Sequence, residues 1–237
     1  MKTIEFDSID STNTYLKENY EKLDDLTFVS ALLQTAGRGR NNRRWLAEKG
    51  SSLMFSLLLK DHFYLDNYRC LSVLAAYNVV KVLEKYQVRD LMIKWPNDVY
   101  AGGKKICGIL LEAVSRNQLE CLIIGTGINV LQESFEGDYL HMPTSLFLET
   151  GRKVDLEQFK KEVYESFINS LNRLKEGHDF HQEIVQYDYL KGKEVYACVK
   201  GVNRAVKVMG INHDYSLKIS FENVETDIDS GEISFHP

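Results

Sequence analysis

Charged and polar side chains gather in four short segments of this 237-residue sequence. The segments span residues 11–13, 34–45, 94–108 and 125–129. In the second segment, Gly37, Arg38, Gly39 and Arg40 are consecutive. A guanidinium group presents paired donors to a carboxylate or phosphate, and glycine lets backbone N–H groups approach the same anion. This loop is therefore a candidate anion site, although arginine runs are also typical of solvated faces, localisation signals and RNA-binding loops.

The third segment combines four kinds of side chain around one turn. Residues 94–98, Lys-Trp-Pro-Asn-Asp, supply a cation, an aromatic ring, an amide and a carboxylate. A double glycine follows and permits the positive φ of a hairpin turn, with Lys105 and Gly108 on its far arm. Taken singly, Trp95 has an explanation as a core side chain and Asp98 as a turn cap. Those explanations do not account for the presence of an arginine-rich loop in the same chain.

Helices and short strands must position these segments. Apolar spacing predicts helices over residues 67–86 and 156–174, the second opened by a capping box. A shorter helix is expected from the N-cap candidates Ser11–Asn13 to about Tyr20, and another around residues 180–190. Strands are expected at residues 2–6, 27–33, 52–59, 91–94, 98–100, 106–114 and 119–124, the last three forming an antiparallel meander.

The pattern changes to short strands after residue 190. These strands are expected near residues 195–199, 205–211, 216–221 and 233–235, a spacing typical of a small β-barrel. We therefore expect two domains, residues 1–190 and residues 191–237. The predicted fold class is α+β, with a mixed, largely antiparallel sheet and packed helices, followed by a small β-barrel.

Composition excludes several classes of protein. With 44% apolar residues, a chain of this length buries a core without disulfides or a structural metal. The 29 basic and 34 acidic residues give a net charge of −5, which argues against binding nucleic acid over a whole face. The four widely spaced cysteines are expected to be reduced core residues of a cytoplasmic protein. Acidic residues near the N-terminus and the lack of a long apolar run argue against export and membrane insertion.

Several motifs together resemble those of the biotin protein ligases. GRGRNNRRW and KWPNDVY, followed by KKICGIL, are similar to the family's GRGRxGRxW, KWPND and KxxGIL segments. STN, GTGIN and the terminal GEIS resemble its flanking motifs. The resemblance implies a class II synthetase-like catalytic domain with an SH3-like barrel. It also implies a ligase that makes biotinyl-5′-AMP from biotin and ATP with Mg²⁺, then biotinylates a lysine of a biotin carboxyl carrier protein domain.

The resemblance also implies roles for individual residues. Lys105, which matches the lysine before x-x-Gly, and Arg40 are the catalytic candidates, and Lys105 is expected between the biotin carboxylate and the α-phosphate. The expected biotin-binding residues are Ser11, Thr12, Asn13, Gln34, Gly37, Arg38, Arg40, Lys105 and Gly108. The expected ATP-binding residues are Arg38, Arg40, Arg43, Trp45, Lys94, Asn97, Asp98 and Asn129. Asn97 and Asp98 are placed in the phosphate and magnesium region, and no metal site built by the protein alone is expected.

The chain departs from the family pattern at two places. Asn42 replaces a glycine of the arginine loop, and asparagine is expected to tolerate the positive φ there. The segment 213–217, HDYSL, stands where the family has an Asp-x-x-Gly-x-Leu turn, so this strand connection is expected to be reshaped without affecting the chemistry.

Two alternative functions remain open at this stage. A lipoate ligase uses the same adenylate chemistry, and the pairing of the two main motifs with a C-terminal barrel favours biotin. The second alternative is a nucleic-acid-binding regulator, because some biotin ligases carry an N-terminal helix-turn-helix. Only ten residues precede Ser11, so we expect no DNA-binding domain and no repressor function. A carboxylase carrier domain is the expected partner, with no membrane, and the oligomeric state is open between monomer and homodimer.

Overall fold

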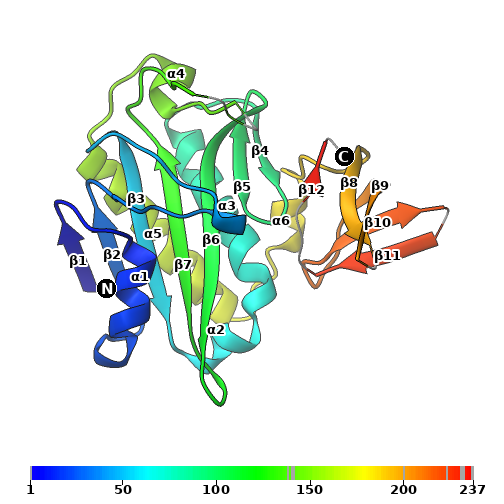
Figure 1. Ribbon diagram of the computed structural model, residues 1–237, viewed down its shortest axis with the longest axis horizontal. Coiled ribbons are helices and arrows are strands. Elements are labelled where there is room, and N and C mark those ends of the chain that lie inside the picture. The colour runs from blue at the N-terminus through cyan, green and yellow to red at the C-terminus, as the bar shows by residue number, and fades with distance from the viewer. Residues whose placement is uncertain are drawn as a thin grey trace.

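The protein is built on two β-sheets, one of seven strands and one of five (Figure 1). The computed structural model describes residues 2–137, 139, 142–199, 201–222, 224–229 and 233–235, and the backbone alone of Asn42. Gly231 and Glu232 of the terminal GEIS motif lie outside the described residues.

The large sheet has the strand order β1-β2-β3-β7-β6-β5-β4. Its strands are β1 (Lys2–Phe6), β2 (Thr27–Ala31), β3 (Ser52–Leu59), β4 (Leu91–Lys94), β5 (Asp98–Ala101), β6 (Lys104–Ser115) and β7 (Leu119–Asn129). Neighbouring strands are antiparallel except β1 and β2, which are parallel. The predicted meander is confirmed as β5, β6 and β7. Strand β7 runs five residues beyond its expected end because residues 125–129 continue to pair with β3.

Helices cover both faces of this sheet. They are α1 (Thr12–Asn19), α2 (His62–Asp66), α3 (Tyr68–Lys85), α4 (Leu146–Thr150), α5 (Leu156–Lys175) and α6 (His181–Val185), with 3-10 turns at Tyr20–Lys22 and Arg40–Asn42. Successive strand residues point to opposite faces. Phe28 of β2 accordingly stacks on Tyr164 of α5, with ring centroids 4.0 Å apart, while Val29 joins Leu16 of α1 in a second cluster. Helices α3 and α5 thus cover one face of the sheet, and α1 covers the other (Figure 1).

Helix α6 is shorter than the expected helix over residues 180–190. It ends at Val185, and the chain then runs beside β4. The Ile93 N–H donates to the Tyr187 carbonyl at 2.7 Å, and the Tyr189 N–H donates to the Ile93 carbonyl at 3.0 Å. Pairing with this strand edge therefore replaces the second half of the predicted helix.

The small sheet has the order β11-β10-β9-β8-β12, and its neighbouring strands are antiparallel. Its strands are β8 (Glu194–Val199), β9 (Val202–Ile211), β10 (Leu217–Phe221), β11 (Val224–Ile228) and β12 (Ile233–Ser234). It stands where the small barrel is expected, although no pairing between β11 and β12 closes it within the described residues. Strand β11 was not predicted, because its sequence, VETDI, lacks the apolar alternation of a half-buried strand. Its side chains are mostly exposed.

The two sheets share one continuous apolar core. Leu190, Val195 and Ala197 belong to the same buried cluster as the α3 and α5 side chains. The Trp95 indole N–H also donates to the Tyr215 carbonyl at 2.9 Å, so the HDYSL connection touches the turn of the KWPND segment. The expected domain division between residues 190 and 191 stays a prediction.

Three of the four cysteines are buried, and all four are free thiols. Cys198 is exposed, contrary to the expectation of a core residue, because Val195 and Ala197 occupy the inward positions of β8. In the part of the chain that the structure describes, no helix has both the length and the apolar character needed to cross a membrane.

Candidate active site

The four polar segments found in the sequence meet at one cavity of about 260 Å³. Every predicted site residue except Gly37 lines it: Ser11, Thr12, Asn13, Gln34, Arg38, Arg40, Arg43, Trp45, Lys94, Asn97, Asp98, Lys105, Gly108 and Asn129. Gly37 is a buried residue of the arginine loop, and a Cβ there would stand 2.7 Å from the Trp45 carbonyl oxygen. This glycine therefore permits a close backbone contact rather than lining the cavity.

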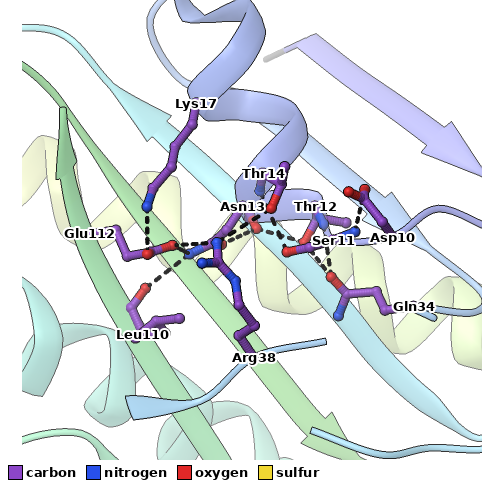
Figure 2. Close-up of polar contacts among 11 residues, drawn as sticks. Asp10, Ser11, Thr12, Asn13, Thr14, Lys17, Gln34, Arg38, Leu110 and Glu112 are labelled. Carbon is purple, nitrogen blue, oxygen red and sulfur yellow. Dashed lines mark hydrogen bonds and ion pairs between the residues drawn. The ribbon is translucent and has the colours of Figure 1, made fainter. Parts of the chain in front are cut away.

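One end of the cavity is a cluster of hydroxyl and amide groups at the start of α1 (Figure 2). Ser11 is the N-cap, as predicted, and its hydroxyl accepts from the Thr14 N–H. The Thr12 N–H donates to Gln34 Oε1 at 2.8 Å, and the Thr12 hydroxyl lies 2.6 Å from that of Ser56. Asn13 is 4% exposed. These groups are held in fixed orientations by one another.

The arginine loop contributes several residues to the lining of the cavity. Arg40 donates from its guanidinium to Asn97 Oδ1 at 3.2 Å, which ties the loop to the turn after β4. Arg38 donates to the Thr14 hydroxyl at 3.3 Å. The positive φ of this loop, 54°, is found at Asn41, one residue before the asparagine expected to adopt it.

A lysine and a carboxylate of the β5–β6 hairpin also line the cavity. Lys105 Nζ lies 2.7 Å from Asp98 Oδ1 and 6.0 Å from the centroid of the Trp45 ring. This places the predicted catalytic lysine in the cavity with its charge balanced by Asp98. Asp98, which was predicted for the phosphate and magnesium region, is therefore paired with Lys105. This ion pair, rather than a turn-capping hydrogen bond, is the main contact of its carboxylate.

The Trp45 ring packs closely against Gly108 and Gly127, the glycine floor of the cavity. A Cβ on Gly127 would stand 2.6 Å from Trp45 Cε2, and one on Gly108 would stand 3.0 Å from Trp45 Cζ3. Side chains at these positions would displace the ring. Gly108, one of the expected biotin-binding residues, makes room for the Trp45 and Lys105 side chains.

Lys94 connects the cavity to the small sheet. It is 5% exposed, with Nζ 5.6 Å from the Phe235 ring centroid and 6.0 Å from that of Tyr100. Ile233 and Ser234 of β12 line the cavity at this end. Cation–π contact with aromatic rings stabilises a buried ammonium group.

Asn129 lines the cavity but uses its amide within the protein. Its Nδ2 donates to the Thr144 carbonyl at 2.9 Å, and its Oδ1 accepts from Gln132 Nε2 at 3.2 Å. These bonds fix the end of β7 against the segment before α4.

Sequence reasoning missed part of the lining. The unexpected residues are Gly39, Asn41, Arg44, Leu46, Phe55, Trp95, Pro96, Ile109, Leu110, Gly125, Thr126, Gly127, Phe135, Tyr139, Pro143, Ile233 and Ser234. Several are neighbours of predicted residues, and GTGIN and GEIS were noted as motifs without roles for these positions. The apolar members carry no chemical signal in the sequence.

More than half of the chain matches a known protein family. Residues 5–129, slightly more than half of the chain, match the model of the Biotin/lipoate A/B protein ligase family. The chain belongs to this family. The match spans the arginine loop, the turn after β4 and the lysine of β6, the segments that build the cavity.

Curated relatives include ligases with and without a named repressor role. The Bifunctional ligase/repressor BirA of Bacillus spizizenii is 40% identical over 132 residues, covering 54% of this chain and 41% of the relative. The Biotin–[acetyl-CoA-carboxylase] ligase of Paracoccus denitrificans is 32% identical over 157 residues, covering 63% and 65%. The chain spans 41% to 65% of the length of four BirA relatives that it matches.

Solved structures match over almost the whole chain. The biotin protein ligase from Aquifex aeolicus in complex with biotin and ATP has a TM-score of 0.87 and 31% identity, covering 98% of this chain and 97% of that one. The biotin protein ligase from Leishmania major in complex with biotinyl-5-AMP has a TM-score of 0.64 at 18% identity, which shows the shared fold alone.

Proposed function

We propose that this protein is an ATP-dependent biotin protein ligase. The observation that carries the proposal is the position of Lys105, which lies in one cavity with a hydroxyl and amide cluster, an arginine loop and the Asp98 carboxylate. An acid-activating ligase needs a cation where a carboxylate meets a phosphate. The family membership and the Aquifex relative with biotin and ATP support the same activity.

In the first step, a carboxylate oxygen of biotin attacks the α-phosphorus of ATP. The bond from that phosphorus to the oxygen bridging the β-phosphate breaks, and pyrophosphate leaves with the electron pair. Negative charge on the reacting phosphate is greatest in the transition state. Lys105 and Arg40 are the cations we assign to stabilise it, and the ion pair with Asp98 holds Lys105 in place.

The hydroxyl and amide cluster is assigned to the ureido ring of biotin. A buried ureido group has one carbonyl acceptor and two N–H donors, and each one left unpaired costs about 1–3 kcal/mol. Ser11, Thr12, Asn13 and Gln34 supply both donors and acceptors at this end of the cavity. Arg38 lies beside this cluster, with its guanidinium 3.3 Å from the Thr14 hydroxyl, and Gly108 adjoins Lys105. Gly37 permits a close backbone contact within the arginine loop.

The opposite end is assigned to ATP. Arg40, Arg43 and Lys94 bring positive charge, and Trp45 brings an aromatic surface. Arg38 lines the same cavity with its guanidinium beside Thr14, and its contact with ATP stays a prediction. Asn129 supports the floor of this end through the bonds of its amide to neighbouring chain segments.

Magnesium is assigned to the bound nucleotide rather than to a resident site. Mg²⁺ in nucleotide sites binds through one or two protein oxygens together with substrate phosphates. Asp98 is the one carboxylate among the described residues that line the cavity, and the Asn97 amide is beside it. Among the described residues no group of three or more His, Cys, Asp or Glu side chains could hold a metal ion. The donor set therefore fits a metal that arrives with ATP.

In the second step, the neutral amine of a carrier lysine attacks the carbonyl carbon of biotinyl-5′-AMP. An amide bond forms, the amine loses a proton, and AMP leaves. No serine or cysteine nucleophile of the ligase takes part. We assign the lysine to a biotin carboxyl carrier protein domain of a carboxylase, the partner class named for the Paracoccus relative. The cytoplasmic location, the oligomeric state and the lack of a repressor role stay predictions.

Competition between labelled ligands tests the choice of substrate. Radiolabelled biotin should be retained by the protein, and retention should increase with ATP because the adenylate dissociates slowly from a site covered by a loop. After addition of a carrier domain, the label should move to the carrier and resist denaturation. Retention and transfer of lipoate with none of biotin would overturn the assignment in favour of the other substrate of this family.

A further inference from the structure

The carboxylate of Glu112 on β6 is partly buried beside the hydroxyl and amide cluster, with 17% of its side chain exposed, and it does not line the cavity. Gly108, Leu110 and Glu112 lie on one face of this strand because residues two apart share a face. The first two line the cavity, and Glu112 is the next residue along. Three donors from two segments converge on it (Figure 2).

One of these contacts comes from Asn13. Its Nδ2 donates to Glu112 Oε2 at 2.7 Å. Lys17 Nζ lies 2.5 Å from the other carboxylate oxygen, and the Arg38 guanidinium lies 3.5 Å from Oε2. Burial alone would raise the pKa of Glu112, but the hydrogen bonds from Lys17 and Asn13 outweigh it, and the pKa is lowered. The group is thus an ionised carboxylate at neutral pH.

An ionised carboxylate accepts hydrogen bonds and donates none. The atom of Asn13 that faces Glu112 must therefore be the amide nitrogen, and Asn13 Oδ1 must face the other way. Ser56 donates its one hydroxyl proton to that oxygen. Because this proton is used, Ser56 can only accept in its 2.6 Å contact with the Thr12 hydroxyl. The Thr12 hydroxyl also lies 3.1 Å from Gln34 Oε1, and we assign its one proton to the shorter contact with Ser56.

This direction of donation decides what the cluster presents to a ligand. With its proton directed to Ser56, the Thr12 hydroxyl keeps both lone pairs for N–H groups. Gln34 Oε1 accepts from the Thr12 N–H, which leaves the Gln34 amide nitrogen as a donor. If the Asn13 amide turned around, Ser56 would donate to Thr12 and occupy one of those lone pairs.

We propose that Glu112 is a positioning residue that fixes the Asn13 amide and thereby sets the direction of the hydrogen-bond chain from Asn13 through Ser56 to Thr12. It touches no ligand and acts through that chain. The inference rests on the proposed function, because the ligand that needs this arrangement is the ureido ring of biotin.

Two variants separate hydrogen-bond direction from the loss of charge. In Glu112→Gln only one oxygen remains, and Lys17 competes with Asn13 for it. When Lys17 attracts that oxygen, the new amide nitrogen faces the Asn13 nitrogen and the Asn13 amide turns. The added substitution Lys17→Ala removes the competitor, so the remaining oxygen returns to Asn13. In such a rescue the effects of the two substitutions do not add. A general loss of packing would not produce this non-additivity.

The test measures KM for biotin and for ATP in steady pyrophosphate release by the full chain, with a carrier domain present. Lys17→Ala alone should stay within about two-fold of wild type, and Glu112→Gln should raise the KM for biotin about ten-fold while the KM for ATP changes less than about two-fold. The double variant should recover to within about three-fold of wild type. A Glu112→Gln enzyme equal to wild type, equal increases in both KM values, or a double variant as weak as the single one would overturn the inference.

A second readout needs no ligand. In ¹⁵N-labelled protein, the Asn13 side-chain amide protons should exchange slowly with solvent in wild type and in the double variant, and at least about ten-fold faster in Glu112→Gln. Equal exchange in wild type and Glu112→Gln would contradict the role of Glu112. A wild-type protein without biotin-dependent activity would instead overturn the proposed function, so the two failures are distinguishable.

Discussion

Lys105 and Asp98 form an ion pair of 2.7 Å between neighbouring strands of one hairpin. Asp98 pairs in register with Gly108 on β6, which brings its carboxylate beside the lysine that precedes that glycine by three residues. The side chains are 26% and 12% exposed. The lysine is therefore positioned in a partly desolvated site, where its charge acts strongly on a reacting anion.

Removal of Lys105 should prevent adenylate formation. Lys105→Ala should lower the rate of pyrophosphate release at least about a hundred-fold, because a preorganised cation is lost where charge develops. Circular dichroism should show an unchanged fold, since the side chain is partly exposed. Lys104→Ala is the matched control, an exposed lysine one position earlier on β6, and should act at near the wild-type rate. Near-wild-type turnover by Lys105→Ala would remove the lysine from the mechanism.

Arg40 should keep the activated intermediate in the cavity. Its hydrogen bond to Asn97 joins the arginine loop to the turn after β4. Arg40→Gly breaks this contact and adds backbone freedom, so biotinyl-5′-AMP should escape and acylate unrelated lysines. Biotin labelling of serum albumin in the same tube should rise several-fold over wild type, whereas Arg152→Gly, at an exposed arginine outside the cavity lining, should leave it unchanged. Equal albumin labelling by Arg40→Gly and wild type would count against this role.

The glycine floor under Trp45 should be intolerant of a methyl group. In Gly127→Ala the new Cβ would meet the indole at 2.6 Å, so the ring must move, and the emission of Trp45 should shift. The KM for ATP should rise several-fold, because Trp45 is assigned to the nucleotide end. Gly39→Ala is a steric control, since its nearest contact would be 3.7 Å. An unshifted emission spectrum in Gly127→Ala would show that the ring does not lie on this glycine in solution.

Acid should weaken the contact between α3 and α6 through Glu183. Its carboxylate accepts from the Tyr77 hydroxyl and lies 2.6 Å from His178 Nε2. Burial alone would raise the pKa of Glu183, but these hydrogen bonds hold it below the ordinary value. The unfolded chain therefore binds more protons, so this part of the stability is present above the ordinary pKa of about 4.3 and is lost as pH falls below it.

Urea unfolding at successive pH values measures this contribution. The free energy of unfolding should fall more steeply on acidification for wild type than for Glu183→Gln, which has no carboxylate to protonate. Parallel curves for the two proteins would show that Glu183 is equally protonated in the folded and unfolded states.

Much of the fold was predictable because local patterns agree with the tertiary structure. Strands β1 and β3 match their predicted bounds, and α5 begins after the predicted cap, Asp155. Strand β11 escaped prediction because its VETDI residues face solvent and show no apolar period. The second half of the helix expected at residues 180–190 is absent because the open edge of β4 pairs with residues 187–189, a competition that local propensity does not register.

The candidate site was predictable where side-chain chemistry marks it. Motif residues such as Lys105 and Arg40 line the cavity as expected. Glu112 was not singled out, because a carboxylate on a strand has no signal until Asn13, 99 positions away in the chain, is seen to donate to it. The pairing of Asp98 with Lys105 was hidden for the same reason, since it depends on strand register.

The central claim is tested most directly by measuring pyrophosphate release from purified protein with ATP and Mg²⁺, with and without biotin. The account predicts release only when biotin and ATP are both present, in a stoichiometric burst when no carrier domain is added and in steady turnover when one is. Release from ATP without biotin, release supported by lipoate in place of biotin, or no release with both substrates would contradict it.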